Sequence, residues 1–464
     1  MRITFLGATE TVTGSKYLIS LGDNRIIMVD CGLFQGLKEL RLRNWNPLPF
    51  DPKILDAVLL THAHIDHTGY LPLLVKNGYQ GHIYSTQGTN DLCKILLPDS
   101  AHLQEEDAVH ANQHGYSKHT PAKPLYTVED AEKALKLFEP QPYSTKLQLY
   151  KDTYFELIRS GHIVGSSFVK INHNGVSLLF TGDMGRMHDP VMQTPTTIEH
   201  VDYLVVESTY GNRLHEKNHP KILLKSIINK TVQRGGSIII PSFAVGRTQS
   251  ILHYLAELKN ENAIPHMPIY LDSPMAINAT HILHKHIDDL RLTHVQCEEL
   301  CDAATYTNTP QESRDIDINK TPKIIISASG MATGGRILFH LKAYAPDERN
   351  TILFTGYQAN GTRGARILNG EKEIKIHGEM IPVRAQIEVI HGASAHADYA
   401  EILEWLKHFC VPPKKTFVTH GEPEASLSLK NRIEAELGWN CVVPHYKETE
   451  NLRAPLEMSP RKAP

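Results

Sequence analysis

Short apolar runs that end in polar or turn-forming residues dominate the first two hundred residues of the chain. Such runs predict buried strands. Residues 1–31 predict two or three strands, the last of which ends at Asp30. Asn174–Gly175 predicts a type I′ hairpin turn. Further strands are predicted over residues 56–61, 82–85, 154–159, 167–173, 176–182 and 203–207.

Helical patterns lie between these strands. One helix is predicted over residues 68–78 and another over 89–97. A capping-box pattern that begins at Thr127 predicts a third helix over residues 131–138. Residues 102–120 are rich in histidine, but these histidines lack the close spacing of metal ligands. A loop or a solvated helix is therefore predicted there rather than a metal site.

From about residue 208 the pattern changes to strands that alternate with helices. Strands are predicted over 237–241, 268–271, 323–327 and 351–354, and helices over 220–234, 249–260, 274–286 and after 329–336. This alternation is typical of a parallel sheet. We therefore predict a second domain over residues 208–388, inserted between the parts 1–207 and 389–464 of the first. The polar residues 298–321 are predicted to form a surface loop of the insert.

The composition is that of a globular protein too long for a single core. The chain has 464 residues, of which 41% are hydrophobic and 21% charged, and its formal net charge is −3. This length favours two domains. The small negative charge argues against a protein that coats nucleic acid non-specifically, although it leaves room for a nuclease with a locally basic groove.

The cysteines and the apolar runs indicate the cellular compartment of the protein and whether it spans a membrane. Six cysteines are scattered along the chain, which favours a reducing cytoplasm over a disulfide framework. Cys297 and Cys301 share a predicted helix without a second Cys/His pair nearby, so we interpret them as structural. The N-terminus lacks a signal-peptide pattern, and no apolar run approaches the ~18 residues of a membrane span. A cytoplasmic protein without membrane contact is predicted.

The strongest chemical signal is the stretch Thr61–His67, which reads THAHIDH. It follows a predicted strand, and open α/β sheets usually bind ligands at the carboxyl ends of strands. Imidazole and carboxylate are ligands that zinc takes. Histidines are also common on surfaces, and the chain has 27 of them. Because a solvated loop has no reason to hold this order, the stretch predicts a metal site built from His62, His64, Asp66 and His67.

Further histidines and carboxylates occur where predicted strands end or where a helix is about to begin: Asp30, His162, Asp183, Glu207, His396 and His420. Taken singly, each is equally well explained as a turn acceptor or a satisfied structural residue. His162 and Asp183 are more specific, because both lie downstream of the THAHIDH stretch and are joined by a single hairpin.

Two predicted strand-to-helix turns in the insert have the composition of anion sites. Gly246–Arg247 opens one helix, and Gly334, Gly335 and Arg336 open another. Glycine lets backbone N–H groups approach a phosphate, and arginine adds charge. Such turns are more often only tight turns. Neither matches the GxxxxGK[ST] nucleotide loop, so a nucleotide cofactor is not expected.

The motif THAHIDHTG resembles the signature of the metallo-β-lactamase superfamily. The later motifs, which include those around His396 and His420, resemble its β-CASP nucleases, and the resemblance runs from Met1 to about Tyr446. It implies an α/β fold in which a metallo-β-lactamase αββα sandwich carries an inserted parallel-sheet β-CASP domain. Ser166, where alanine is expected, is a mild departure from the family pattern.

The resemblance also implies roles for single residues and two Zn²⁺ per chain. His62, His64, His162 and Asp183 would hold one ion, and Asp66, His67, Asp183 and His420 the other. Asp30 would orient an imidazole from behind the ligands, and Glu207 would lie beside the active site. Neither ion needs His396, so we predict that it is the general acid and that Glu207 holds it in place. Asp66, Glu207 and His396 are thus the predicted catalytic residues.

Three classes of function compete. A zinc-dependent ribonuclease that cuts single-stranded RNA, mainly endonucleolytically, would use a water activated between two metals as nucleophile. A small-molecule hydrolase of the same superfamily would leave the region from Glu207 to His396 unexplained, and a non-catalytic paralogue would have lost ligands that are all present here. A nuclease directed at DNA stays an alternative. RNA hydrolysis, with 5′-exonucleolysis and homo-oligomerisation left open, is the predicted function.

Overall fold

Two sheets form a sandwich in the computed structural model, which describes residues 1–22, 24–115, 120–216, 218–356, 358, 361–390, 392 and 394–453. In spatial order, the first sheet contains β22 (Thr449–Asn451), β1 (Arg2–Phe5), β2 (Lys16–Gly22), β3 (Arg25–Cys31), β4 (Ala57–Leu59), β5 (His82–Ser85) and β6 (Phe138–Pro140). The second contains β21 (Cys441–Val442), β20 (Lys415–Thr419), β11 (Tyr203–Glu207), β10 (Val176–Phe180), β9 (Ser167–His173), β8 (Thr153–Arg159) and β7 (Leu147–Tyr150).

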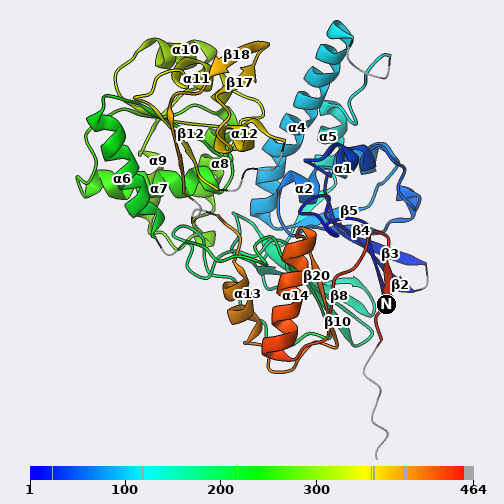
Figure 1. Cartoon of the computed structure of the whole chain (residues 1–464). Helices are drawn as coiled ribbons and strands as arrows, with labels where there is room; N and C mark the ends of the chain where they lie inside the picture. Colours follow the sequence, from blue (N-terminus) through cyan, green and yellow to red (C-terminus); the bar gives the residue numbers. More distant parts are fainter. Residues whose placement is uncertain are drawn as a thin grey trace, which may run out of the picture.

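Alternating apolar positions on the two sheets meet in a buried layer, and helices cover both outer faces. Phe5 and Ile27 of the first sheet share an apolar cluster with Leu178 and Phe417 of the second. The helices of the sandwich are α1 (Lys38–Arg43), α2 (Ile65–Thr68), α3 (Leu71–Lys76), α4 (Gln87–His114), α5 (Val128–Leu135), α13 (Tyr399–Leu406) and α14 (Pro423–Leu437). A 3₁₀ turn lies at Pro52–Ile54. The predicted αββα sandwich is confirmed (Figure 1).

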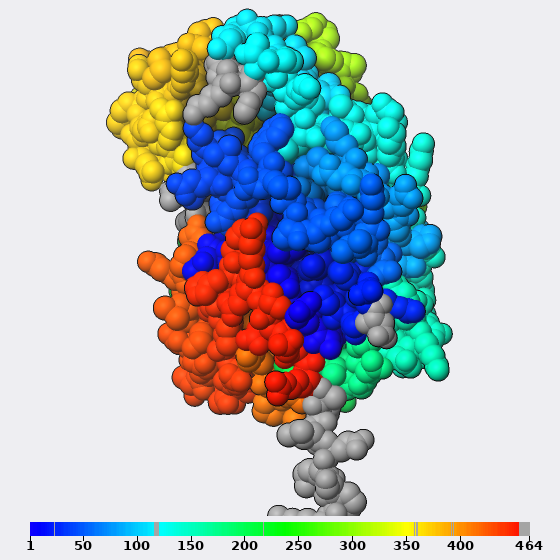
Figure 2. Space-filling model, turned by 90° about the vertical axis from the view of Figure 1, so that its right-hand side faces the viewer, coloured from blue at the N-terminus to red at the C-terminus, as the bar shows by residue number. Residues whose placement is uncertain are grey.

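The C-terminal part of the chain returns to the first domain. β22 pairs with β1 in antiparallel register, so the first and last strands of the chain are neighbours in one sheet. Figure 2 shows the blue N-terminal and red C-terminal surfaces side by side. The predicted boundaries at residues 208 and 388 stay a prediction. β11 of the second sheet ends at Glu207, and the last strand of the insert's sheet ends at Val389.

A parallel sheet lies between those limits. It contains β14 (Thr305–Tyr306), β13 (Ile269–Leu271), β15 (Ile324–Ser327), β12 (Ile238–Pro241), β16 (Thr351–Phe354) and β19 (Gln386–Val389), and a hairpin of β17 (Glu373–Ile376) and β18 (Glu379–Pro382) is appended. Its helices are α6 (Pro220–Gln233), α7 (Arg247–Asn260), α8 (Pro274–Lys285), α9 (His294–Cys301), α10 (Pro310–Ile318), α11 (Ile337–Tyr344) and α12 (Arg363–Leu368), with a 3₁₀ turn at Ile287–Asp289. The strand pairs are parallel, as predicted.

The surface loop predicted over residues 298–321 is wrong. This segment contains the end of α9, the short strand β14 and the helix α10. Thr309 and Glu312 form a capping box, and Ser313 and Ile316 are the buried residues of α10. A polar composition concealed a short amphipathic helix, although the Thr-Pro-Gln-Glu start was a readable signal.

Three predicted helices differ in their extents. The helix predicted over 68–78 is two helices, and α2 begins earlier, at Ile65, so Asp66 and His67 lie on a helix rather than a loop. α4 continues to His114, which makes part of the histidine-rich segment a largely exposed helix. Residues 116–119 of that segment lie outside the described residues. The capping box at Thr127 is confirmed, with α5 spanning Val128–Leu135.

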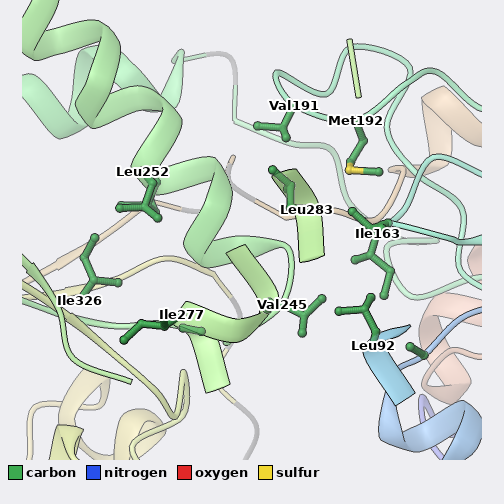
Figure 3. Packing of buried hydrophobic residues seen from close by; sticks show 14 of the residues in the cluster. Leu92, Ile163, Val191, Met192, Val245, Leu252, Ile277, Leu283 and Ile326 are labelled. Atoms are coloured by element: carbon green, nitrogen blue, oxygen red, sulfur yellow. The ribbon is translucent and has the colours of Figure 1, made fainter. Parts of the chain in front are cut away.

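The two domains share one apolar cluster. Leu92, Ile163 and Met192 of the sandwich domain belong to the same buried cluster as Val245 and Leu283 of the insert (Figure 3). A cavity of about 20 Å³ remains at this contact, beside His162 and Gly246. The domains are therefore joined by packed side chains. No helix in the described ranges is long and apolar enough to cross a membrane.

Candidate metal centre and active site

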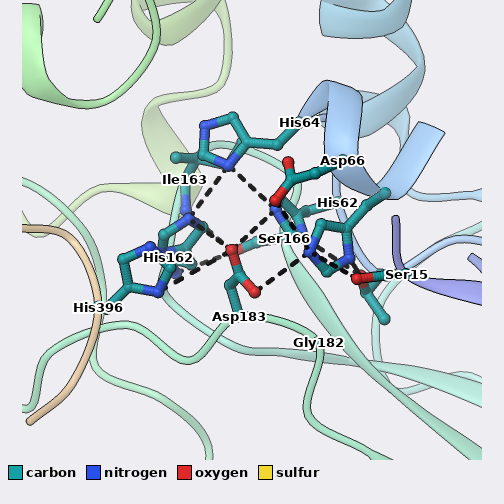
Figure 4. Close-up of polar contacts among 12 residues, drawn as sticks. Ser15, His62, His64, Asp66, His162, Ile163, Ser166, Gly182, Asp183 and His396 are labelled. Atoms are coloured by element: carbon teal, nitrogen blue, oxygen red, sulfur yellow. Dashed lines mark hydrogen bonds and ion pairs between the residues drawn. The ribbon is translucent and has the colours of Figure 1, made fainter. Parts of the chain in front are cut away.

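The predicted ligands converge at one edge of the sandwich, where several strands end. The stretch 61–67 leaves β4, Asp183 follows β10, and His420 follows β20. Figure 4 shows the side chains of His62, His64 and His162 directed toward the carboxylate of Asp183. Gly182 permits this approach, since its φ is +50° and a Cβ there would lie 2.5 Å from Cβ of Thr61. The strand ends thus bring together residues more than a hundred positions apart.

The first donor group consists of His62, His64, His162 and Asp183. Nε2 of His62 lies 3.0 Å from Nδ1 of His64 and 3.3 Å from Oδ2 of Asp183. Nε2 of His162 lies 3.3 Å from Nδ1 of His64 and 3.5 Å from Oδ2 of Asp183. A tetrahedral zinc site with bonds of about 2.0–2.1 Å has ligand-to-ligand edges of about 3.3 Å. The four donor atoms are spaced to fit one such ion.

The second donor group consists of Asp66, His67 and His420, with the other oxygen of Asp183. Nε2 of His67 lies 3.2 Å from Nε2 of His420 and 3.2 Å from Oδ1 of Asp183. Nε2 of His420 lies 3.4 Å from Oδ2 of Asp66. Oδ1 of Asp183 is buried and has no hydrogen-bond partner among the described residues. Because a buried carboxylate oxygen needs a partner, this atom fits a second cation.

Asp30 lies behind the second group and contacts His67. Nδ1 of His67 donates a hydrogen bond to Oδ2 of Asp30 over 2.7 Å, which leaves Nε2 of the ring facing the donor group. The backbone N–H and hydroxyl of Thr61 donate to the same carboxylate, each over 2.8 Å. A carboxylate on the far nitrogen fixes the tautomer and orientation of a ligand histidine. Asp30 and His420 both have a positive φ, of 55° and 50° respectively. Positive φ is uncommon for non-glycine residues, and residues with this conformation cluster at functional sites.

Burial makes the first group's imidazoles suitable donors. It lowers the pKa of His62 to about 3, with a further contribution from His67. It also lowers the pKa of His64, and lowers that of His162 well below its ordinary value. His67 is also buried, but the carboxylates of Asp183 and Asp30 outweigh burial and raise its pKa. The three imidazoles of the first group are therefore neutral at physiological pH, which is the form of histidine that binds metal.

His396 and Glu207 face this cluster from one side. Nδ1 of His396 donates to the Glu207 carboxylate over 3.2 Å and lies 3.9 Å from Oδ2 of Asp183. Burial alone would lower the pKa of His396, but the neighbouring carboxylates of Glu207 and Asp183 raise it to about 9. The backbone N–H of Met184 donates to Glu207 over 2.5 Å. The pair is thus a protonated imidazole held by a buried carboxylate, next to both donor groups.

Sequence reasoning missed side chains that contact the second group, among them Thr209 and Ser15, whose hydroxyl lies 3.3 Å from Nε2 of His67. The hydroxyl of Thr209 lies 3.0 Å from Nδ1 of His420. Thr209 occurs two positions after Glu207 in the Glu-Ser-Thr sequence that ends β11. That proximity was a readable signal, but β11 and β20 had to be known as neighbours before it could be connected with His420.

The two predicted phosphate turns have different surroundings. At the first, the N–H groups of Arg247 and Thr248 donate to the carbonyls of Val245 and Phe243, so the backbone closes on itself. Gly246 has φ +81° and lies against Ile163, the residue after His162. Nη1 of Arg247 is buried without a hydrogen-bond partner among the described residues. If this turn binds an anion, Nη1 of Arg247 is the group available to contact it, rather than the glycine backbone.

At the second turn the arginine is already paired. Nη1 of Arg336 donates to Oδ1 of the buried Asp272 over 2.5 Å and to the carbonyl of Thr307, and Nη2 donates to the carbonyl of Asn308. The Arg336 guanidinium is therefore held by Asp272 and by two backbone carbonyls, and its contact with a phosphate stays a prediction. Gly334 has open space around it, and a role for Gly334 and Gly335 stays a prediction.

Comparison with known proteins agrees with this geometry. Residues 18–209 match the metallo-β-lactamase superfamily domain, residues 248–367 the β-CASP domain, and residues 380–444 the Zn-dependent metallo-hydrolase RNA specificity domain. A solved structure of a protein of unknown function from Enterococcus faecalis has the same fold, with a TM-score of 0.54 at 14% identity over 97% of this chain and 99% of the other.

Two curated relatives are similar over most of their length. Ribonuclease TTHA0252 of Thermus thermophilus is 35% identical over 436 residues, which cover 92% of this chain and 95% of the relative. The transcription termination factor FttA of Methanosarcina mazei is 32% identical over 467 residues, which cover 94% of this chain and 69% of the relative. These relatives and the matching domains show that the chain belongs to the β-CASP family of the metallo-β-lactamase superfamily.

Proposed function

We propose that this metal-dependent hydrolase is a two-zinc ribonuclease that acts in the cytoplasm and cleaves single-stranded RNA, mainly endonucleolytically. The observation that carries the proposal is the pair of donor groups that share Asp183, with the His396–Glu207 pair beside them. Ribonuclease activity of a similar protein and the match to an RNA specificity domain support RNA as the substrate. The scatter of the six cysteines along the chain favours a reducing compartment.

Metal binding, orientation of a ligand and proton transfer are assigned to different residues of the site. His62, His64, His162 and Asp183 would hold one zinc, and Asp66, His67, Asp183 and His420 the second. When bound, such a pair polarises the phosphate and supplies an activated water. Asp30 keeps the His67 ring in the orientation that the second group needs. His396, protonated and held by Glu207, is placed to deliver a proton to the leaving 3′-oxygen.

Single strands fit the site better than duplexes. Most donors are buried, whereas Asp66 and His396 keep 18% and 19% of their side-chain surface exposed. The packed domain contact on the neighbouring side encloses a cavity of about 20 Å³. A scissile phosphate must therefore reach a recessed cluster, which a flexible strand does more readily than a stiff helix.

The proposal is tested by incubating the purified protein with labelled single-stranded RNA, single-stranded DNA and blunt RNA duplex, each with and without chelator. Chelator-sensitive cutting of single-stranded RNA is expected, with little cutting of the duplex. Preference for DNA would move the assignment to a DNA-directed nuclease. Equal cutting of single strands and duplexes would reject the recessed-site argument.

Arg247→Ala is expected to weaken RNA binding by removing one phosphate contact. Nη1 of the half-buried Arg247 side chain has no hydrogen-bond partner among the described residues, which suits it to an RNA phosphate. The slope of log binding constant against log salt concentration should flatten by about 0.7, the value for one phosphate of a single strand. Binding titrations at several salt concentrations measure this slope, and an unchanged slope would show that the turn is only structural.

Arg336→Ala is the matched arginine and should behave in the opposite way. Removing it leaves the buried carboxylate of Asp272 with fewer partners. Breaking a buried pair typically costs roughly 3–5 kcal/mol, and the loss here should lie near or below the lower end because the Arg336 side chain is 20% exposed. Urea unfolding should show this loss, while the salt slope of RNA binding should equal that of the wild type. A flattened slope would restore Arg336 as a phosphate contact.

A further inference from the structure

His215 lies outside both donor groups, on the segment that leads from β11 into α6. Its side chain is 4% exposed, although the adjacent Leu214 is exposed. Nε2 of His215 donates to the backbone carbonyl of His396 over 2.9 Å. Its backbone N–H donates to Oδ2 of Asp398, also over 2.9 Å. A histidine at the start of the insert thus binds the loop that carries the proposed acid.

That loop is held from a second side by the segment after Asp183. Gly185 and His396 form an isolated antiparallel bridge, and the N–H of Ala397 donates to the carbonyl of Met184 over 2.9 Å. Together these contacts hold the backbone on one side of the His396 ring, while Glu207 holds Nδ1 of the ring itself. His215 supplies the hydrogen bond to the carbonyl of the same residue.

The same neighbourhood has the composition of a third metal site, because donor atoms of His215, Asp398 and Glu401 lie within 4.8 Å of one another. Their hydrogen bonds argue against an ion. Asp398 caps α13 through Oδ1 and accepts from His215 through Oδ2. Glu401 accepts from the N–H groups of Met187 and Asp398. Since each donor atom already has a protein partner, the three residues form a closed hydrogen-bond network.

We propose that His215 is a positioning residue, which fixes the backbone of His396 so that the imidazole points at the leaving oxygen. The proposal rests on the acid role given to His396 above. The ring of Tyr210 contacts both histidines, with its centroid 5.2 Å from that of His215 and 6.1 Å from that of His396. The segment that opens the insert therefore helps to place the proton donor of the sandwich domain.

The test compares His215→Ala and His215→Gln with the wild type. A misplacement of about 1 Å in a reacting group costs on the order of 10²-fold, so His215→Ala should lower kcat by roughly 10- to 100-fold, with KM and zinc content unchanged. Gln keeps an N–H donor at the reach of Nε2 and should recover most of the rate. His219→Ala is the matched control, since His219 lies on the same segment, is exposed and caps α6; its kcat should equal that of the wild type.

Two readouts separate positioning from general damage. On RNA with sulfur in place of the leaving 3′-oxygen, which departs without a proton, His215→Ala should cleave nearly as fast as the wild type. In a double-mutant cycle, His215→Ala should add little to the loss caused by His396→Ala. Additive losses, an equal loss on the sulfur substrate, or a wild-type kcat would each overturn the proposal. A wild type that cuts no RNA would instead reject the proposed function.

Discussion

Asp183→Ala is expected to abolish RNA cleavage and to release both metal ions. Asp183 gives Oδ2 to the first donor group and Oδ1 to the second, so one substitution removes a donor from both. Without the ions nothing lowers the pKa of the attacking water toward neutrality, so kcat should fall by at least ~10⁴-fold. Elemental analysis should find about two zincs per wild-type chain and far fewer in the variant.

The matched control is Asp202→Ala. Asp202 is a buried carboxylate that accepts from the N–H and hydroxyl of Ser177 and pairs with Lys414, away from both donor groups. Its removal should lower stability and leave the zinc content unchanged. One zinc or fewer in the fully active wild type, or an Asp183→Ala protein that keeps both ions, would contradict the shared-ligand arrangement.

His396→Ala is expected to keep both zincs and RNA binding while kcat falls by ~10²–10⁴-fold, the usual contribution of a positioned acid. Neighbouring carboxylates raise the pKa of His396 to about 9. A general acid must be protonated, so wild-type activity should be highest below that pKa and decline as the pH rises through about 9. The variant should lack this decline. Rates measured from pH 6 to pH 10 would check both statements.

The control for this prediction is chemical. On RNA with sulfur at the leaving position, the departing thiolate needs no proton, so His396→Ala should approach the wild-type rate. If the variant is equally defective on both substrates, or if it loses zinc, His396 acts on metal binding or on substrate placement instead.

Much of the site could be predicted from the sequence because its residues are tied to strand ends. A buried strand has a clear apolar pattern, and a His or Asp at its end points to the edge of the sheet where ligands bind. The THAHIDH stretch predicted a metal site in this way, and the strand ends singled out His162 and Asp183, whose roles as ligands came from the family resemblance. His420 needed the family resemblance, because nothing local distinguishes it from a structural histidine.

The remainder depended on tertiary contacts that no local pattern encodes. Arg247 and Arg336 follow similar glycine-containing turns, yet only Arg336 meets a buried carboxylate, Asp272, from another strand end. His215 lies in a polar stretch and is buried only because the loop of His396 folds against it. The helix α10 was missed for a different reason, since its polarity outweighed a capping signal that was readable.

The apolar cluster shared by the sandwich and the insert has a consequence for how the enzyme comes apart. Leu92 and Ile163 on one side and Val245 and Leu283 on the other would all be exposed if the insert separated. Exposing each Å² of this apolar surface to water costs about 25 cal/mol. A partly unfolded intermediate, with one domain folded and the other unfolded, is therefore disfavoured. Heating should therefore produce a single calorimetric transition, and the insert should not stay folded when it is separated from the sandwich domain.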